Sequence, residues 1–413
     1  MPTTKTLHLM LLSGVAAVAL SAPASALEAE AFVDRVAEVY RTLGYELSFG
    51  PATLDGDTVT VDGVTVEVLG VDDEEPMVLD TTLTFTGVTE TEDGAYWAEA
   101  LTVPDVDTVF TDDEDDAEGR VTLSDIRVEG LYFPAGDTLS AVEQVQLFEA
   151  ASTGTLSVFR NDVEVISVES MEARTTFAPE QGSAELADVE STLAINGIWA
   201  DLASLSEDDA ESAAVIDQLG LAEINGSITQ HTSWSLADGH MQMHEFLFDF
   251  DDVGALNITF DITGFTPGLL DQIYAMQAQM GAGEEMTDEQ AQAQMMSSMA
   301  LMQGVNIVSA SIRYDDASLA GSLLDFFAED AGTDRAEFVE ALKQQLPEML
   351  DGVGIPALKD LLVPPVSAFL DNPQSIEIAA RPASPTSLLV LMAAAANPAG
   401  LIPALGLTVT ANQ

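Results

Sequence analysis

The sequence predicts an α+β protein built on a long, twisted antiparallel β-sheet, a meander with one apolar face covered by C-terminal helices. Three observations lead to this fold class. Apolar and polar residues alternate with a period of two in many short segments between residues 45 and 262, which is typical of strands that bury one face. Turn residues separate these segments, and from Thr266 the pattern changes to that of amphipathic helices. We therefore expect a β-rich region with an N-terminal helix over residues 27–265, and an α+β helical region over residues 266–413 that packs on the sheet.

The first 26 residues predict a secretory signal peptide. Lys5 supplies the positive start, residues 7–20 form the apolar run, and Ala24-Ser25-Ala26 matches a cleavage site. Cleavage near Ala26 predicts a periplasmic or secreted protein. No later segment has the roughly 18 uninterrupted apolar residues of a spanning helix, because Asn397-Pro398 breaks the run that begins at Ser387. We therefore expect no integral membrane span.

The elements of the β-rich region follow in order. Residues 28–43 predict an amphipathic helix, with Gly44 as its C-terminal stop. Alternating valines from Val59 to Val68 predict a hairpin that turns at Asp62-Gly63. The same alternation predicts strands within residues 79–85, 96–103, 121–133, 156–168, 186–199 and 224–262, with a helix over 207–219.

The C-terminal region begins with a helix start signal, in which Thr266 is the N-cap and Pro267 occupies the first turn. Helix-forming segments predict helices at about 267–281, 288–303, 318–330, 334–350, 355–370 and 386–396. Strands are expected between them over residues 305–314, 375–380 and 405–411.

The charge balance is extreme, because 12 Lys and Arg residues stand against 70 Asp and Glu residues, for a net charge of −58. The chain is nevertheless 47% apolar, so we expect it to fold despite its self-repulsion, with a halophilic-like acidic surface. Such a polyanion excludes nucleic acid as a partner, since that affinity depends on Lys and Arg displacing counterions. Weak binding of divalent cations is expected instead.

Signatures of catalysis are missing from the sequence. It has no cysteine, no Gly-x-Ser-x-Gly and no phosphate-binding Gly-Lys-Ser/Thr loop, so we expect no catalytic residues, no cofactor and a non-enzymatic protein. His231 and His244 are predicted to share one sheet face, while His240 would lie about 13 Å along the strand from His244. Two ligands make a weak metal site, so exposed polar histidines are the favoured interpretation and no metal site is predicted.

A possible hydrophobic ligand face combines two groups of side chains. Alternation places Phe246, Phe248 and Phe250 on one sheet face, and helical spacing aligns Met295, Met299 and Met302. Ordinary packing is the favoured interpretation of such methionines, since methionine fills irregular gaps. The hypothesis is a protein that binds a lipid or apolar small molecule between sheet and helices. The alternative is an acidic structural or interaction protein of the cell envelope with loose divalent-cation binding, and the oligomeric state is left open.

Two C-terminal segments resemble known proteins. Ser311-Ile312-Arg313-Tyr314-Asp315-Asp316-Ala317-Ser318-Leu319 and the run from Pro364 to Ile376 resemble uncharacterised exported proteins of Gram-negative bacteria that carry domains of unknown function. The β-rich part is similar in texture to AsmA-like envelope proteins. That resemblance implies meandering sheets that form grooves for lipid chains, and it implies no catalytic residues.

Overall fold

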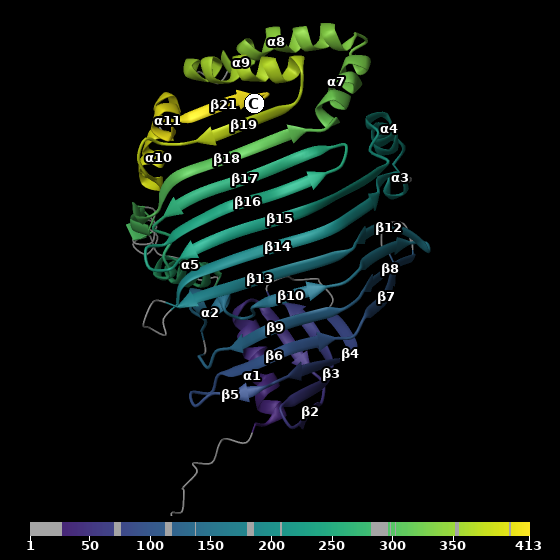
Figure 1. Cartoon of the computed structure of the whole chain (residues 1–413), viewed down its shortest axis with the longest axis vertical. Coiled ribbons are helices and arrows are strands. Elements are labelled where there is room, and N and C mark those ends of the chain that lie inside the picture. Colours follow the sequence, from purple (N-terminus) through teal and green to yellow (C-terminus); the bar gives the residue numbers. More distant parts are fainter. Residues whose placement is uncertain are drawn as a thin grey trace, which may run out of the picture.

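The computed structural model describes residues 27–69, 76–111, 118–136, 138–179, 186–206, 209–281, 296–297, 299–301, 303–351, 355–395 and 398–413. The predicted signal peptide and most of the helix predicted over 288–303 lie outside these residues. Within them, 21 strands form one antiparallel sheet and most of the helical residues follow residue 266, which confirms the α+β class (Figure 1).

The bounds of the elements are as follows. The described helices are α1 (Ala29–Thr42), α2 (Ala141–Val145), α3 (Leu202–Leu205), α4 (Ala210–Leu219), α5 (Pro267–Gly281), α7 (Leu319–Asp330), α8 (Arg335–Asp351), α9 (Pro356–Asp371), α10 (Leu388–Ala395) and α11 (Pro398–Leu405). The strands of the first half are β1 (Tyr45–Phe49), β2 (Ala52–Asp55), β3 (Thr58–Val68), β4 (Met77–Thr86), β5 (Thr89–Glu90), β6 (Tyr96–Val103), β7 (Val106–Thr111), β8 (Glu118–Leu123), β9 (Ile126–Phe133), β10 (Ala150–Thr153), β11 (Leu156–Arg160) and β12 (Val163–Val168). The later strands are β13 (Ser170–Pro179), β14 (Leu186–Asp201), β15 (Glu223–Ser235), β16 (His240–Phe250), β17 (Gly254–Thr263), β18 (Asn306–Asp316), β19 (Ser375–Ala380), β20 (Thr386–Ser387) and β21 (Leu407–Ala411).

The strands pair mostly with their neighbours in sequence. The main path through the sheet runs β3–β4–β6–β9–β10–β13–β14–β15–β16–β17–β18–β19–β21. The sheet forks at the long strand β14, whose second half pairs with β12 and leads through β11 and β8 to β7. Because β17 and β18 pair across residue 265, the sheet is continuous there, and the proposed division into two regions stays a prediction.

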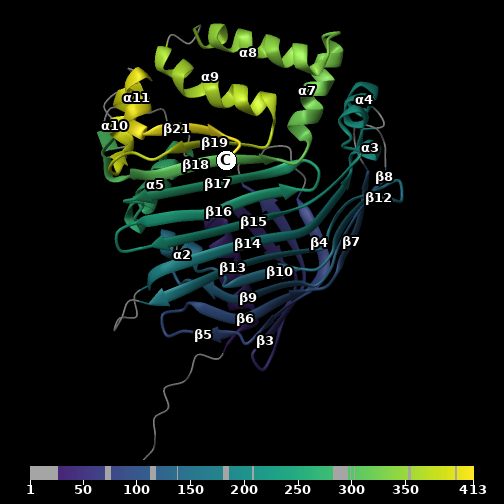
Figure 2. The same ribbon diagram turned by 45° about the horizontal axis from the view of Figure 1, so that its top comes forward.

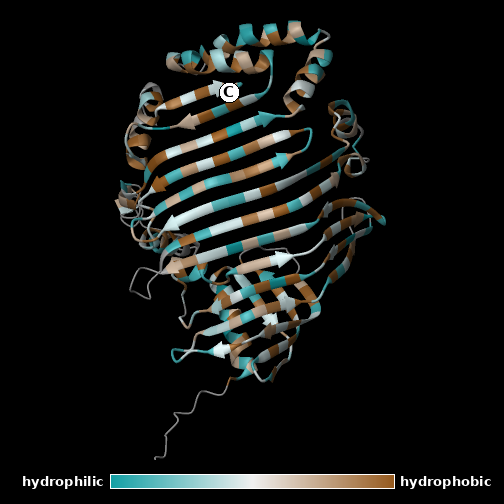
Figure 3. Ribbon diagram, in the orientation of Figure 1, coloured by the Kyte–Doolittle hydropathy of each residue, from teal (hydrophilic) through white to brown (hydrophobic). Residues whose placement is uncertain are grey.

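The register separates an apolar face from a polar face. Directly paired residues in antiparallel strands point to the same side, so each row of partners marks one face. We call apolar face the side that carries the row Ile195, Ile228, Phe248, Leu256, Tyr314, Ile376 and Ala411. We call polar face the opposite side, which carries the rows Thr192–His231–Glu245 and Asn257–Arg313–Glu377–Thr410. The alternation along each strand is visible in Figure 3.

The N-terminal helix α1 fills the main core. Phe32 is fully buried and contacts the rings of Phe85, Tyr96 and Phe133 edge-on, at centroid distances of 5.0–5.6 Å. Such edge-to-face pairs contribute beyond their buried area. A row of paired residues connects this core with the apolar face of the later strands, through Phe85, Leu101, Val128, Ala151, Ala173 and Leu193. Helix α1 therefore covers the apolar face at the N-terminal end of the sheet.

Helices α2 and α5 cover a second part of the apolar face. Val189 and Trp234 are buried there, and side chains of both helices, including Val142 and Leu270, pack against them. The Trp234 indole Nε1 donates a hydrogen bond to the carbonyl oxygen of Phe265, at 2.7 Å. This bond fixes the entry into α5, which begins at Pro267 as the sequence predicts.

The other C-terminal helices lie differently from the expectation. Figures 1 and 2 show α8 and α9 beyond the β19–β21 edge, and α9 contacts both of these strands. The two nearly buried residues of β19, Ser375 and Ala379, lie on the polar face, whereas Ile378 on the apolar face is 49% exposed. The exposure of Ile378 shows that this part of the apolar face stays open. No helix among the described residues has the length and apolar character needed to cross a bilayer.

The hairpin predicted at Asp62-Gly63 is wrong. Strand β3 runs through both residues, and its register with β4 shifts between Asp62 and Val64, which is a β-bulge. Gly63 has φ +87°, a conformation that glycine adopts without strain in either a bulge or a turn. The actual hairpin joins β2 to β3 at Gly56.

Candidate functional site

The three phenylalanines of β16 lie together on the apolar face. Phe246, Phe248 and Phe250 pair with Gln230, Ile228 and Gly226 of β15, which places all three rings on one side as predicted. The ring centroids of Phe246 and Phe248 are 4.5 Å apart, and each of the three side chains is half-buried. They form an aromatic strip in the middle of the sheet.

Aliphatic side chains extend this strip across the next strands. A second row on the same face consists of Ile258, Ile312, Ile378 and Val409. Ile312 is 51% exposed and Ile378 is 49% exposed, so solvent reaches the middle of this row. We call open apolar surface the set of residues Phe246, Phe248, Phe250, Leu256, Ile258, Phe260, Ile312, Tyr314, Ile376, Ile378 and Val409. The row through Phe248 crosses seven strands, a span of about 29 Å at the usual strand spacing.

Most of the methionines predicted for the ligand face lie outside the described residues. Met295 and Met302 lie outside the described residues, and Met299 is helical and 40% exposed. The combination of the phenylalanine strip with a methionine-rich helix therefore stays a prediction.

The apolar face is almost free of charge. From β13 to β21, the described strand residues on this face include one ionisable carboxylate, Asp316, at the end of β18. Asp316 Oδ1 accepts hydrogen bonds from the Tyr314 hydroxyl at 2.8 Å and from the Ala320 backbone N–H at 2.8 Å. Burial, followed by the hydrogen bond to Asp316, raises the pKa of Tyr314 above its ordinary value of 10. This keeps the hydroxyl neutral at the edge of the open apolar surface.

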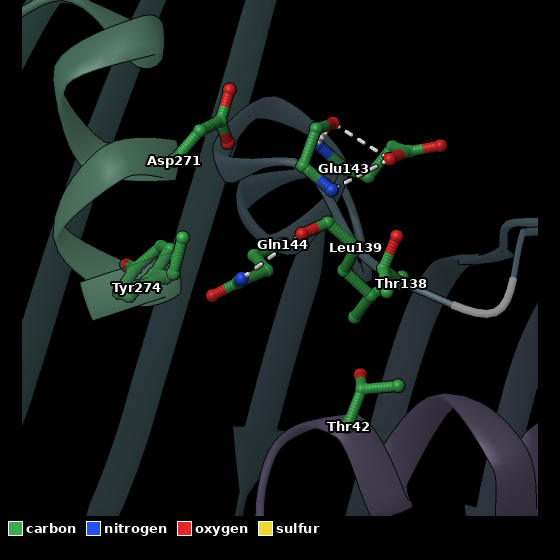
Figure 4. A pocket seen from close by; sticks show the side chains of 9 residues that line it. Thr42, Thr138, Leu139, Glu143, Gln144, Asp271 and Tyr274 are labelled. Atoms are coloured by element: carbon green, nitrogen blue, oxygen red, sulfur yellow. Dashed lines mark hydrogen bonds between the residues drawn. The ribbon is translucent and has the colours of Figure 1, made fainter. Parts of the chain in front are cut away.

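A pocket of about 590 Å³ lies where α1, α2 and α5 meet (Figure 4). Three of its polar side chains, those of Ser140, Glu143 and Asp271, cap α2. Asp271 accepts from the Ala141 N–H at 2.7 Å, and Ser140 and Glu143 form a capping box. Because these groups already bond to backbone, the pocket offers shape but few free polar contacts. The open apolar surface is therefore the stronger candidate.

The histidine side chains lie on the polar face. The rings of His231 and His244 lie 4.8 Å apart. The turn before β16 spans four residues and a bulge falls at His244, so Ser233 pairs with Gln242 in the sheet. His231 Nε2 contacts Glu190 Oε1 at 2.7 Å, and His240 Nε2 contacts Asp261 Oδ1 at 2.8 Å. No group of three His, Cys, Asp or Glu side chains within the described ranges is placed to hold a metal ion. The imidazoles are explained by these polar contacts.

Sequence reasoning about the site missed the exposed isoleucines. Ile312 and Ile378 belong to segments predicted as strands, but their exposure depends on which helix covers which face. The signal that was present is the alternation in Ile376-Glu377-Ile378, which places both isoleucines on one side.

Comparison with known proteins gives a family match over part of the chain. A search of curated proteins finds no match to this chain. A family described as "Uncharacterized protein" matches residues 247–412, the segment that contains β17 to β21 and most of the open apolar surface.

Proposed function

We propose that the protein is a non-enzymatic binding protein, and that it holds a hydrophobic or lipid-like ligand on the open apolar surface. The observation that carries this proposal is the half exposure of Ile312 and Ile378 inside a continuous row of apolar residues. Single exposed aliphatic residues are ordinary, but contiguous exposed apolar surface marks interaction sites.

The shape of the surface favours extended chains. A span of about 29 Å along one row is close to the roughly 30 Å hydrocarbon thickness of a bilayer, in which acyl chains from two leaflets meet end to end. The aromatic strip of Phe246 and Phe248 offers ring faces and edges for methylene groups. Each methylene that is fully removed from water contributes about 0.8 kcal/mol, so affinity should rise with chain length.

The proposed cellular location rests on the sequence alone. The signal peptide predicts export to the periplasm or beyond, and the resemblance to exported Gram-negative proteins agrees with it. The resemblance to AsmA-like proteins supports a groove for lipid chains. We propose that the protein works in the cell envelope or outside it.

The test is native mass spectrometry of protein purified from its own host. The wild-type chain should carry co-purifying apolar molecules, and the double variant Ile312→Asp/Ile378→Asp should lose them. The matched control is Asn225→Asp/Thr408→Asp, which adds the same two charges at exposed positions of the polar face and should retain the ligand. A homogeneous ligand-free mass for the wild type would contradict the proposal and favour the acidic structural or interaction protein.

A further inference from the structure

The lysine and arginine residues of the second half of the chain are all paired with carboxylates. After Arg174 the sequence contains five bases, and each forms an ion pair with a carboxylate. The pairs are Arg313–Asp315, Arg335–Asp325, Lys343–Asp371, Lys359–Asp351 and Arg381–Glu377. A ligand that carries a negative charge would have to compete with a protein carboxylate for any of them.

The lysine and arginine side chains nearest in sequence to the apolar rows also lie away from the apolar face. Arg313 lies on the polar face, where Asp315 binds its guanidinium through two hydrogen bonds of 2.7 and 2.6 Å and the Gln413 carbonyl oxygen accepts a third at 2.8 Å. Arg381 bonds to Glu377, whose row also lies on the polar face. The apolar face therefore presents no lysine or arginine from β13 to β21 among its described strand residues.

The electrostatic field of the whole chain also disfavours anionic ligands. With a net charge of −58, the chain repels anions at distances up to the Debye length, about 10 Å at 0.1 M salt. An anionic group brought against the apolar face would also lose hydration without gaining a charged partner, which is costly. A neutral head group is not repelled by this field, and a cationic head group is attracted by it, which offsets part of the cost of its own desolvation.

We propose that the open apolar surface takes amphiphiles with an uncharged or cationic head group, and that it discriminates against carboxylate and phosphate head groups. This inference rests on the proposed function and specifies its ligand class.

The experiment compares three probes that share one sixteen-carbon chain, below their micelle concentrations at pH 8. These are monohexadecanoylglycerol, hexadecyltrimethylammonium and hexadecanoate, each measured by displacement of a neutral fluorescent apolar dye from the full chain. At low salt we expect the first two to bind about tenfold or more tighter than hexadecanoate. The difference should shrink in 1 M salt, where the Debye length is about 3 Å.

Two variants sharpen the test. Ile378→Lys places an unpaired cation on the open apolar surface, whereas Ile378→Gln is polar without charge. Hexadecanoate should bind Ile378→Lys several-fold tighter than Ile378→Gln, while the glycerol ester should bind both alike. Circular dichroism and thermal midpoints confirm that each variant is folded.

The outcomes separate the two proposals. Binding of all three probes with equal affinity, abolished by Ile312→Asp/Ile378→Asp, would overturn the head-group selectivity and leave the proposed function standing. Failure of every probe to bind folded wild-type protein, or binding that the double variant does not weaken, would overturn the proposed function and the selectivity with it.

Discussion

The Tyr314 hydroxyl lies between Asp316 Oδ1, at 2.8 Å, and the carbonyl oxygen of Val253, at 2.9 Å. Val253 belongs to the turn between β16 and β17, and Asp316 also accepts from Ala320 at the start of α7. One phenol therefore connects the end of the apolar face, the turn beside it and the first helix after β18.

Tyr314→Phe is expected to destabilise the protein by about 0.5–1.5 kcal/mol, because it removes the one hydroxyl proton that the Val253 carbonyl oxygen and the Asp316 carboxylate share, while both oxygens keep a backbone N–H donor. Urea unfolding followed by circular dichroism measures the change in the free energy of unfolding. Tyr45→Phe is the matched control, since Tyr45 is 42% exposed, and its effect should stay within about 0.5 kcal/mol. Equal effects of the two substitutions would contradict the role given to Tyr314.

Stability should also fall at alkaline pH. Burial raises the pKa of Tyr314 above 10, so in this range the unfolded chain loses the proton before the folded protein does. The contribution of this group to stability is therefore complete below pH 10 and declines as pH rises above 10. Free energies of unfolding between pH 8 and pH 11 should show this decline, with a smaller slope in Tyr314→Phe. An unchanged slope would show that other groups cause the decline.

Trp234→Phe is expected to loosen α5 from the sheet. The substitution removes the donor to the Phe265 carbonyl oxygen and leaves space beside Val189, at a cost of about 1–3 kcal/mol. Amide hydrogen exchange should accelerate in the first turns of α5. Trp199→Phe is the control, because its indole bonds to Glu223 at the surface, and exchange in α5 should not respond to it.

Gly197→Ala is expected to disturb the fork of the sheet. Gly197 lies in the bulge of β14 with φ +60°, and an added Cβ would come within 2.3 Å of Glu169 Cγ. Gly56→Ala is matched to it, because Gly56 has φ +69° but an added Cβ there would meet no heavy atom within 4 Å. Both variants carry the left-handed strain of roughly 1–2 kcal/mol, so the further loss in Gly197→Ala, about 1–3 kcal/mol, measures crowding. Thermal unfolding of the two variants gives the comparison, and equal losses would rule out crowding.

Local signals predicted many of the element boundaries. Thr266-Pro267 placed the start of α5, and alternation placed β19 at residues 375–380 as observed. The helix predicted over 355–370 also forms, as α9, with Pro364 and Pro365 inside it. These elements succeed because capping, proline geometry and period act within a few residues of the chain.

Turns and register were harder to predict. Asp62-Gly63 has the composition of a two-residue hairpin, but pairing of β3 with β4 on both sides of Gly63 makes it a bulge. The turn before His240 ends in Asp238-Gly239, which also has the composition of a two-residue turn, but it spans four residues. Both outcomes depend on strand pairing with distant residues, which alternation alone does not specify.

For the candidate site, too, the local pattern was predictable from the sequence and the contacts between distant strands were not. The strip of Phe246, Phe248 and Phe250 followed from alternation within one strand. The rows that join it to Ile312 and Ile378 depend on the register of several strands, and the exposure of those isoleucines depends on where α9 packs. Hydrogen bonds such as that of Trp234 to Phe265 have no sequence signature at all.

One row of paired residues begins at Phe85, which is buried under α1, and ends at the half-buried side chains of β16. The same face of the sheet is therefore closed to solvent at one end and accessible at the other. The core around α1 can stabilise the fold whether or not a molecule covers the accessible end. If a ligand binds there as proposed, its release would leave the packing around α1 intact, since the side chains that contact α1 are not those of the open apolar surface.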